Sequence, residues 1–142
     1  MIYKAELERL NVSTWASRDL RALLLDKTSP YAFDRTDVFV NDAMSAGGVE
    51  GGWLQGRAVL TLSTPTFSTP WWQLPASSID WGLIGTGAGD ETAGMLIYEH
   101  VTDDTDSLLV CYMGASPTVD VWDGTNPFTV TFSGGWIMRV GE

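Results

Sequence analysis

Short apolar runs separated by turn-forming residues dominate the hydrophobic pattern of this chain. Residues 20–25, between Asp19 and Asp26, are aliphatic except for Arg21, which is typical of a buried strand. Residues 128–132 alternate apolar side chains with threonines, the pattern of a half-buried antiparallel strand. Similar runs rich in β-branched and aromatic residues predict further strands at 57–62, 79–84, 95–100, 108–113, 118–122 and 136–140.

Turn chemistry separates these runs, with clusters of Gly, Pro, Asn, Asp and Ser at 102–106, 114–117, 123–127 and 133–135. Close-set turns and little helical periodicity predict an all-β fold. We expect an antiparallel β-sandwich or a jelly-roll-like domain, preceded by a short N-terminal helical or extended segment. Its predicted core contains Leu24, Leu60, Ile97, Leu109, Phe128, Val130 and Phe132.

Three segments depart from the strand pattern. Residues 3–10 could form one or two helical turns, and residues 1–14 could form an N-terminal arm. Residues 40–56 are rich in Gly and Ala without a clear period, so we expect a long loop that is mobile until it meets a partner. Residues 64–70 contain two prolines and indicate an edge or a connection. No repeat or linker divides residues 1–142, which we therefore treat as a single domain.

The charge balance argues against two classes of partner. The chain has 8 basic and 18 acidic residues, a formal net charge of −10, and no cluster of Lys and Arg. Such a surface repels phosphate, so we expect neither nucleic-acid binding nor affinity for an anionic membrane. Charged residues make up only 18% of the chain, which fits a surface that meets neighbouring proteins.

The membrane and export patterns are also missing from the sequence. No apolar run is long enough to cross a membrane, and the charged first ten residues do not resemble a signal peptide. Cys111, the sole cysteine, excludes an intramolecular disulfide. It lies in an apolar run and is predicted to be a small buried hydrophobe rather than a reactive thiol.

No pattern of residues in the sequence indicates an active site. His100 is the only histidine, which excludes metal sites with several histidines, and no Gly-x-Ser-x-Gly motif supplies a triad serine. We interpret it as a strand-end histidine near solvent or a sheet partner. The glycine-rich residues 85–89 lack a following Lys, so we interpret them as a turn rather than a phosphate loop. We expect no enzymatic activity and no cofactor.

Asp103, Asp104 and Asp106 form the densest acidic cluster. They could contribute to a calcium loop, because Ca²⁺ takes carboxylate ligands. They lack the spacing and the distal Glu of an EF-hand, so a solvated hairpin turn is the favoured interpretation.

The seven tryptophans provide the candidate contact surface. Trp81, Trp122 and Trp136 lie in strand-like runs and are predicted to be core residues. Trp53 and the pair Trp71–Trp72 lie in segments marked by Gly or Pro, where aromatic residues are typical of contact surfaces. The predicted interface contains Val49, Trp53, Leu54, Trp71 and Trp72.

Taken in order, several segments resemble a known family. They are the run Asp19–Asp26, Tyr31-x-Phe33-Asp34-x-x-Asp37-x-Phe39, Arg57-x-Val59-Leu60, Ile79-x-Trp81, Ala93-Gly94-Met95-Leu96-Ile97-Tyr98, the acidic turn with Ser107–Tyr112, Phe128–Phe132 and Gly135-Trp136-Ile137. This series is similar to small structural proteins of tailed bacteriophages, encoded among head and tail morphogenesis genes and described as capsid-decorating or otherwise virion-associated. The glycine-rich turn and the Trp71–Trp72 pair depart from that family's pattern.

The resemblance implies a non-enzymatic structural protein of a phage virion, assembled in the host cytoplasm. The first expectation is a capsid decoration or cement protein, present in many copies as a homo-oligomer on the particle and bound to the major capsid protein or other virion proteins. A head-tail or tail component is an alternative. A third possibility, from another class, is a carbohydrate-binding module whose loop tryptophans stack on sugars.

Overall fold

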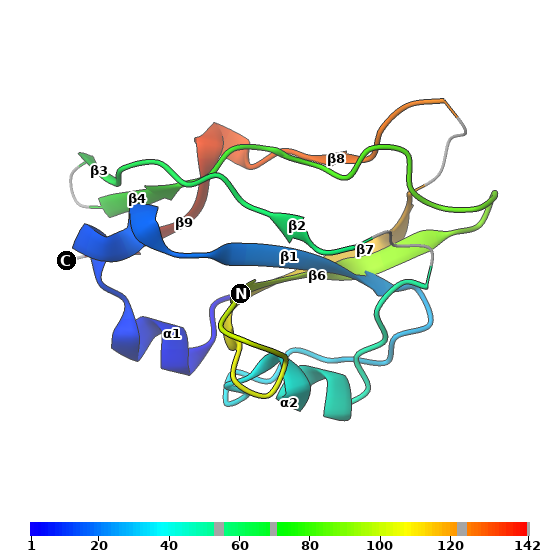
Figure 1. The fold of residues 1–142 in the computed structure, drawn as a ribbon, viewed down its shortest axis with the longest axis horizontal. Helices are drawn as coiled ribbons and strands as arrows, with labels where there is room; N and C mark the ends of the chain where they lie inside the picture. Colours follow the sequence, from blue (N-terminus) through cyan, green and yellow to red (C-terminus); the bar gives the residue numbers. More distant parts are fainter. Residues whose placement is uncertain (53–55, 69–70, 122–124, 142) are drawn as a thin grey trace.

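The computed structural model describes residues 1–52, 56–68, 71–121 and 125–141, in which strands predominate (Figure 1). The helical elements are short: α1 (Lys4–Arg9), α2 (Val40–Ser45) and the 3₁₀ helices η1 (Val12–Ser17) and η2 (Ser133–Gly135). The strands are β1 (Leu20–Asp26), β2 (Ala58–Val59), β3 (Thr66–Ser68), β4 (Trp71–Pro75), β5 (Ile79–Asp80), β6 (Glu91–Glu99), β7 (Leu108–Asp120), β8 (Thr129–Val130) and β9 (Trp136–Gly141). The predicted all-β class is confirmed.

The strands form three antiparallel sheets. The main sheet has the order β2-β1-β6-β7, a three-stranded sheet has the order β3-β4-β9, and β5 pairs with β8. In Figure 1 the main sheet crosses the middle of the molecule. Strands β3, β4 and β8 of the smaller sheets lie above it, and the helices α1 and α2 lie below it. We call the part built from the two smaller sheets the upper layer.

Both faces of the main sheet are buried, which explains why residues 22–25 of β1 are all aliphatic. Successive strand residues point to opposite faces. Leu20, Ala22 and Leu24 contribute to one hydrophobic core, which also contains Leu74 and Phe132 of the upper layer. Leu23 and Leu25 contribute to a second core on the other face, together with Tyr3, Tyr31, Val40 and Ala43.

The predicted core is largely observed. Leu24, Leu60, Ile97, Leu109 and Phe132 are buried. Phe128, Val130 and Trp81 are partly buried and pack against the first core. Trp136 is also partly buried, and Trp122 lies outside the described residues.

The predicted turn at 114–117 is wrong, because β7 runs without interruption through this segment. The pairing with β6 shifts here: Gly94 lies opposite Gly114, whereas Thr92 lies opposite Val119. The extra residues on β7 therefore form a bulge. A bulge accommodates Gly and Pro within a strand, because the residues it contains need not follow the ladder.

The predicted long loop at 40–56 is also corrected. Its first six residues form α2, whose entry is fixed by the Asp42 carboxylate, which accepts hydrogen bonds from the Val38 and Phe39 amides at 3.0 and 2.9 Å. The following residues are tied to β1, since the Asp26 amide donates to the Val49 carbonyl at 2.8 Å. This backbone pairing attaches the chain at Val49 to the end of β1.

The N-terminal segment lies along the main sheet instead of extending away as an arm. The Tyr3 amide donates to the Val110 carbonyl at 3.2 Å, and the Tyr112 amide donates to the Met1 carbonyl at 2.8 Å. The predicted helical turns are observed as α1. In η1, the fully buried Trp15 donates its indole N–H to the Pro75 carbonyl at 3.0 Å and so attaches this segment to β4.

Candidate functional site

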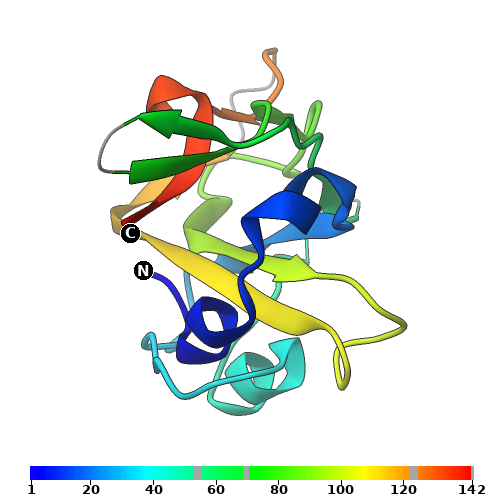
Figure 2. The same cartoon turned by 90° about the vertical axis from the view of Figure 1, so that its left-hand side faces the viewer.

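The β3–β4 hairpin carries the largest exposed aromatic side chains of the upper layer. Phe67 lies opposite Trp72, and their ring centroids are 5.3 Å apart. Phe67 and Trp71 are each 44% exposed, although each is a large hydrophobic residue. Figure 2 looks onto this end of the molecule and shows the hairpin at an outer corner, far from α2.

Strand geometry distributes these rings over both sides of the hairpin. Alternation along β4 places Trp72 on the same side as the buried Leu74, and Trp71 on the opposite side. Phe67 shares the side of Trp72, because directly opposed residues of an antiparallel pair point the same way. We call Phe67, Trp71 and Trp72 the aromatic hairpin. The predicted connection at 64–70 thus contains strand β3, and Trp71–Trp72 belong to β4.

A shallow uncharged groove borders the aromatic hairpin. It has a volume of about 440 Å³ and separates η1 from the chain that leads into β3. Its lining is Val12, Ser13, Ala16, Thr64, Pro65 and Trp72. Trp72 therefore contributes one ring face to a concave surface that could receive an apolar side chain of a partner.

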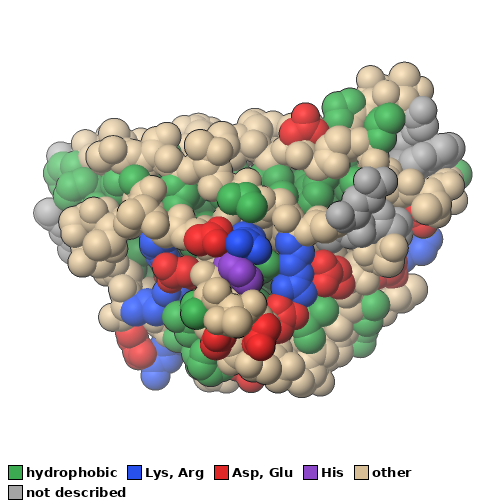
Figure 3. Space-filling model, in the orientation of Figure 1, with side chains coloured by type: hydrophobic (Ala, Val, Ile, Leu, Met, Phe, Trp, Pro, Cys, Tyr) green, Lys and Arg blue, Asp and Glu red, His purple; other side chains and the backbone are tan. Residues whose placement is uncertain are grey.

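The upper layer is almost free of charge. The sequence contains no Asp, Glu, Lys or Arg at 58–79 or at 124–138, and these segments supply β3, β4, β8 and the first residues of β9. On the face shown in Figure 3, charged side chains gather around the histidine in the lower half, whereas the upper band is mainly hydrophobic and uncharged. A surface without charges loses little solvation energy when a partner covers it.

The structure brings together only part of the predicted interface. Trp71 and Trp72 lie in the aromatic hairpin. Val49 is 43% exposed but lies beside Asp26, at the end of β1 farthest from η1 and the hairpin. Trp53 and Leu54 lie outside the described residues. Phe67 was not predicted, although a lone aromatic residue between Pro65 and Pro70 in a charge-free segment is a usable signal.

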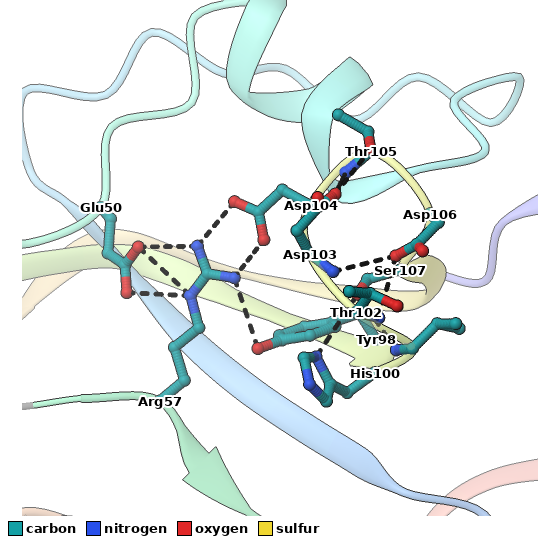
Figure 4. A network of polar contacts seen from close by, with 11 residues as sticks. Glu50, Arg57, Tyr98, His100, Thr102, Asp103, Asp104, Thr105, Asp106 and Ser107 are labelled. Atoms are coloured by element: carbon teal, nitrogen blue, oxygen red, sulfur yellow. Dashed lines mark hydrogen bonds and ion pairs between the residues drawn. The ribbon is translucent and has the colours of Figure 1, made fainter.

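A polar cluster lies on the main sheet (Figure 4). The Arg57 guanidinium bridges Glu50 and Asp104, with distances of 2.9 Å from Nη2 to Glu50 Oε2 and 2.8 Å from Nη2 to Asp104 Oδ2. The same guanidinium lies over the Tyr98 ring, 5.4 Å from its centroid. Its hydrogen bonds hold the pKa of Asp104 below its usual range. Arg57 thereby joins the segment after α2 to the turn at 101–107.

An open hollow of about 430 Å³ lies beside this cluster, lined by Arg21, Arg57, Tyr98, His100, Thr102, Asp103, Asp104 and Thr105. His100 Nδ1 lies 3.5 Å from the Ser107 hydroxyl. Ser107 is fully buried and does not line the hollow, so this Ser–His pair presents no nucleophile to a ligand. The position of His100, just after β6 and partly buried against Tyr98, agrees with the predicted strand-end histidine.

The acidic turn is stabilised by its own carboxylates. Asp106 Oδ1 accepts the Thr102 and Asp103 amides at 3.0 Å each, and Asp103 Oδ1 accepts the Thr105 amide at 2.8 Å. The predicted solvated turn holds for Asp103, which is exposed, but not for Asp104, which is partly buried against Arg57. Within the described residues, no three His, Cys, Asp or Glu side chains are placed to hold a metal ion.

Two further expectations from the sequence concern Cys111 and membrane-spanning segments. Cys111 is buried, as predicted, and burial raises the pKa of its thiol to about 12. None of the helices in the described part of the chain has the length and apolar character needed to cross a membrane.

Comparison with known proteins adds no further restriction on the function. The chain matched no family model, no curated protein and no solved structure.

Proposed function

We propose that this chain is a non-enzymatic structural protein of a phage virion that docks onto a neighbouring protein through the aromatic hairpin. One observation carries the proposal. Phe67 and Trp71 are each 44% exposed in the uncharged segment 58–79 of a domain whose net charge is −10. Exposed aromatic residues grouped in this way are typical of protein interfaces, where Trp and Tyr supply much of the binding energy.

The distribution of charge fits a crowded particle. Copies held close together repel one another through their acidic surfaces, which favours solubility and opposes aggregation. The uncharged segment 58–79 can be covered without burying charges of its own, and this avoids the largest desolvation penalty at an interface. In this arrangement the upper layer faces the partner and the acidic faces remain in solvent.

The resemblance of the sequence to phage structural proteins supports the identity of the partner. On this basis the chain is a capsid decoration or cement protein, and its partner is the major capsid protein. A head-tail or tail position would use the same surface on another virion protein. The polar cluster around Arg57 supports a structural role, because its carboxylates neutralise the one guanidinium and Ser107 is buried.

The variant Trp71→Ala tests the docking surface. Binding to capsids assembled without this protein should weaken about tenfold or more, the effect of losing one interface hot spot. The melting temperature should change little, because Trp71 points away from Leu74 and the core. Added salt should also have little effect on wild-type binding, because the hairpin residues 66–75 carry no charges. Affinity is measured by co-sedimentation with the particles.

The variant Val59→Ala is the matched control, since Val59 is 65% exposed on β2 and lies outside the aromatic hairpin. Equal binding of Trp71→Ala and wild type would show that the hairpin is not the docking surface. A polysaccharide that quenches tryptophan fluorescence of the wild type, but not of Trp71→Ala, would instead support a carbohydrate-binding module.

A further inference from the structure

We infer that β3 pairs with β3 of a second copy of this chain across a two-fold axis. The two three-stranded sheets β3-β4-β9 would then form one continuous sheet. This inference rests on the proposed function, because it names one partner of the same hairpin. Its support is the exposed and uncharged outer edge of β3.

Among the described residues, the long strands of the main sheet present no open edge, and the outermost strand β2 has only two residues. On one side, Ile2 and Phe39 bridge to Cys111 and Leu108 of β7. On the other, β1 is covered by β2 and by a bridge from Leu25 to Glu50. Strand β3 has three residues, and β4 is its sole strand neighbour in the described part of the chain. Its outer backbone groups are therefore available to another strand.

The β3 edge also lacks the usual protection against pairing. Natural edge strands are commonly blocked by Lys or other charged residues. Thr66, Phe67 and Ser68 carry no charge and are all exposed, and the chain is uncharged from 58 to 79. A second copy brings ten net negative charges with it, so contact between acidic faces is unfavourable. At the β3 edge, two copies can meet without placing carboxylates opposite one another.

The sequence of β3 suits an antiparallel pair centred on Phe67. That register places Phe67 opposite its symmetry mate and Thr66 opposite Ser68. Since Phe67 already lies 5.3 Å from Trp72, pairing would build a row of four aromatic rings across the joined sheet. A three-residue edge gives weak association in solution, which becomes significant when copies are concentrated side by side on a surface.

Sedimentation velocity over a range of concentrations tests the inference. The wild type should show a monomer–dimer equilibrium, and Phe67→Lys should weaken it about tenfold or more, because two lysines would meet at the centre of the interface. Val59→Lys makes the same charge change at an exposed strand position outside the hairpin and should leave dimerisation intact. Circular dichroism should show equal folding of all three proteins.

Disulfide trapping tests the register. Phe67→Cys should form a covalent dimer under mild oxidation, since opposed residues of an antiparallel pair lie within disulfide reach. Val59→Cys should not, and the native Cys111 is buried and does not interfere. A wild type that is monomeric at every concentration, or a dimer that survives Phe67→Lys, would overturn the inference. If the monomeric wild type still binds capsids through Trp71, the proposed function stands without the dimer. If dimers form but Trp71→Ala binds capsids normally, the proposed docking surface is wrong and the dimer inference stands.

Discussion

At the scale of single residues, the least predictable feature is the buried carboxylate of Glu6. It is fully buried, and both of its oxygens contact Arg18, whose side chain is 8% exposed. Arg18 Nη2 also donates to Glu99 at 2.8 Å, and Arg9 contacts both carboxylates. A buried charge is tolerated only when it is paired in this way. The partners are distant in sequence, so the hydrophobic pattern could not reveal the cluster.

Glu99 links this cluster to the pH dependence of stability. Burial alone would raise the pKa of Glu99, but hydrogen bonds from Arg18 and Arg9 outweigh it and hold the pKa below its usual range. A carboxylate with a lowered folded-state pKa stabilises the protein above its unfolded pKa, about 4.3, and loses this contribution as the pH falls through the folded value. Glu99→Gln should therefore lower the free energy of unfolding by about 1–3 kcal/mol at neutral pH.

Urea unfolding of wild type and Glu99→Gln at a series of pH values measures this effect. The difference in unfolding free energy should shrink as the pH drops below about 4.3. Glu8→Gln serves as the control, since the Glu8 side chain is 66% exposed and its pair with Lys4 lies on the surface. A difference that stays constant into the acidic range would refute the role assigned to Glu99.

At the scale of elements, sequence patterns succeeded where the period was strong. The run 20–25 predicted β1 because burial on both faces favours consecutive apolar residues, as at 22–25. The helix α2 was missed because its six residues are too few to show a helical period. The turn predicted at 114–117 failed because Gly and Pro are compatible with a bulge as well as with a turn. In 128–132 the alternation is correct, although only Thr129–Val130 pair as β8.

Beside the bulge in β7, Gly94 of β6 occupies a position where a larger residue would clash with the neighbouring strand. A Cβ atom on Gly94 would lie 2.7 Å from the Met113 carbonyl oxygen and 3.0 Å from the Gly114 Cα. Gly94→Ala should therefore destabilise the fold by about 1–3 kcal/mol, because backbone on the neighbouring strand must shift. Thermal unfolding followed by circular dichroism would measure the loss. Gly87→Ala, where a Cβ meets nothing within 4 Å, should remain within about 0.5 kcal/mol of the wild type. Equal stability of the two variants would mean that β6 and β7 are not this close at Gly94.

At the scale of the whole molecule, the fold gathers two separate uncharged segments into one layer. The sequence shows that 58–79 and 124–138 lack charges, but not that they lie together. Their association depends on long-range pairing, namely β4 with β9 and β5 with β8. The same limit applies to the predicted contact residues. Trp71–Trp72 was predicted from local composition, whereas the separation of Val49 from this pair follows only from the path of the chain.

The burial of the main sheet on both faces has a consequence for hydrogen exchange. Strands β1 and β6 each have a neighbouring strand on both sides and lie between two hydrophobic cores. Their amides should therefore exchange only through global unfolding. Amides of β3 and β4, in a short sheet at the surface, should exchange through local opening at much lower free energy. Exchange measured by mass spectrometry should show two separate rate classes, and uniform protection would contradict this. Such a division would let the upper layer adjust its shape to a neighbour while the central strands hold the fold intact.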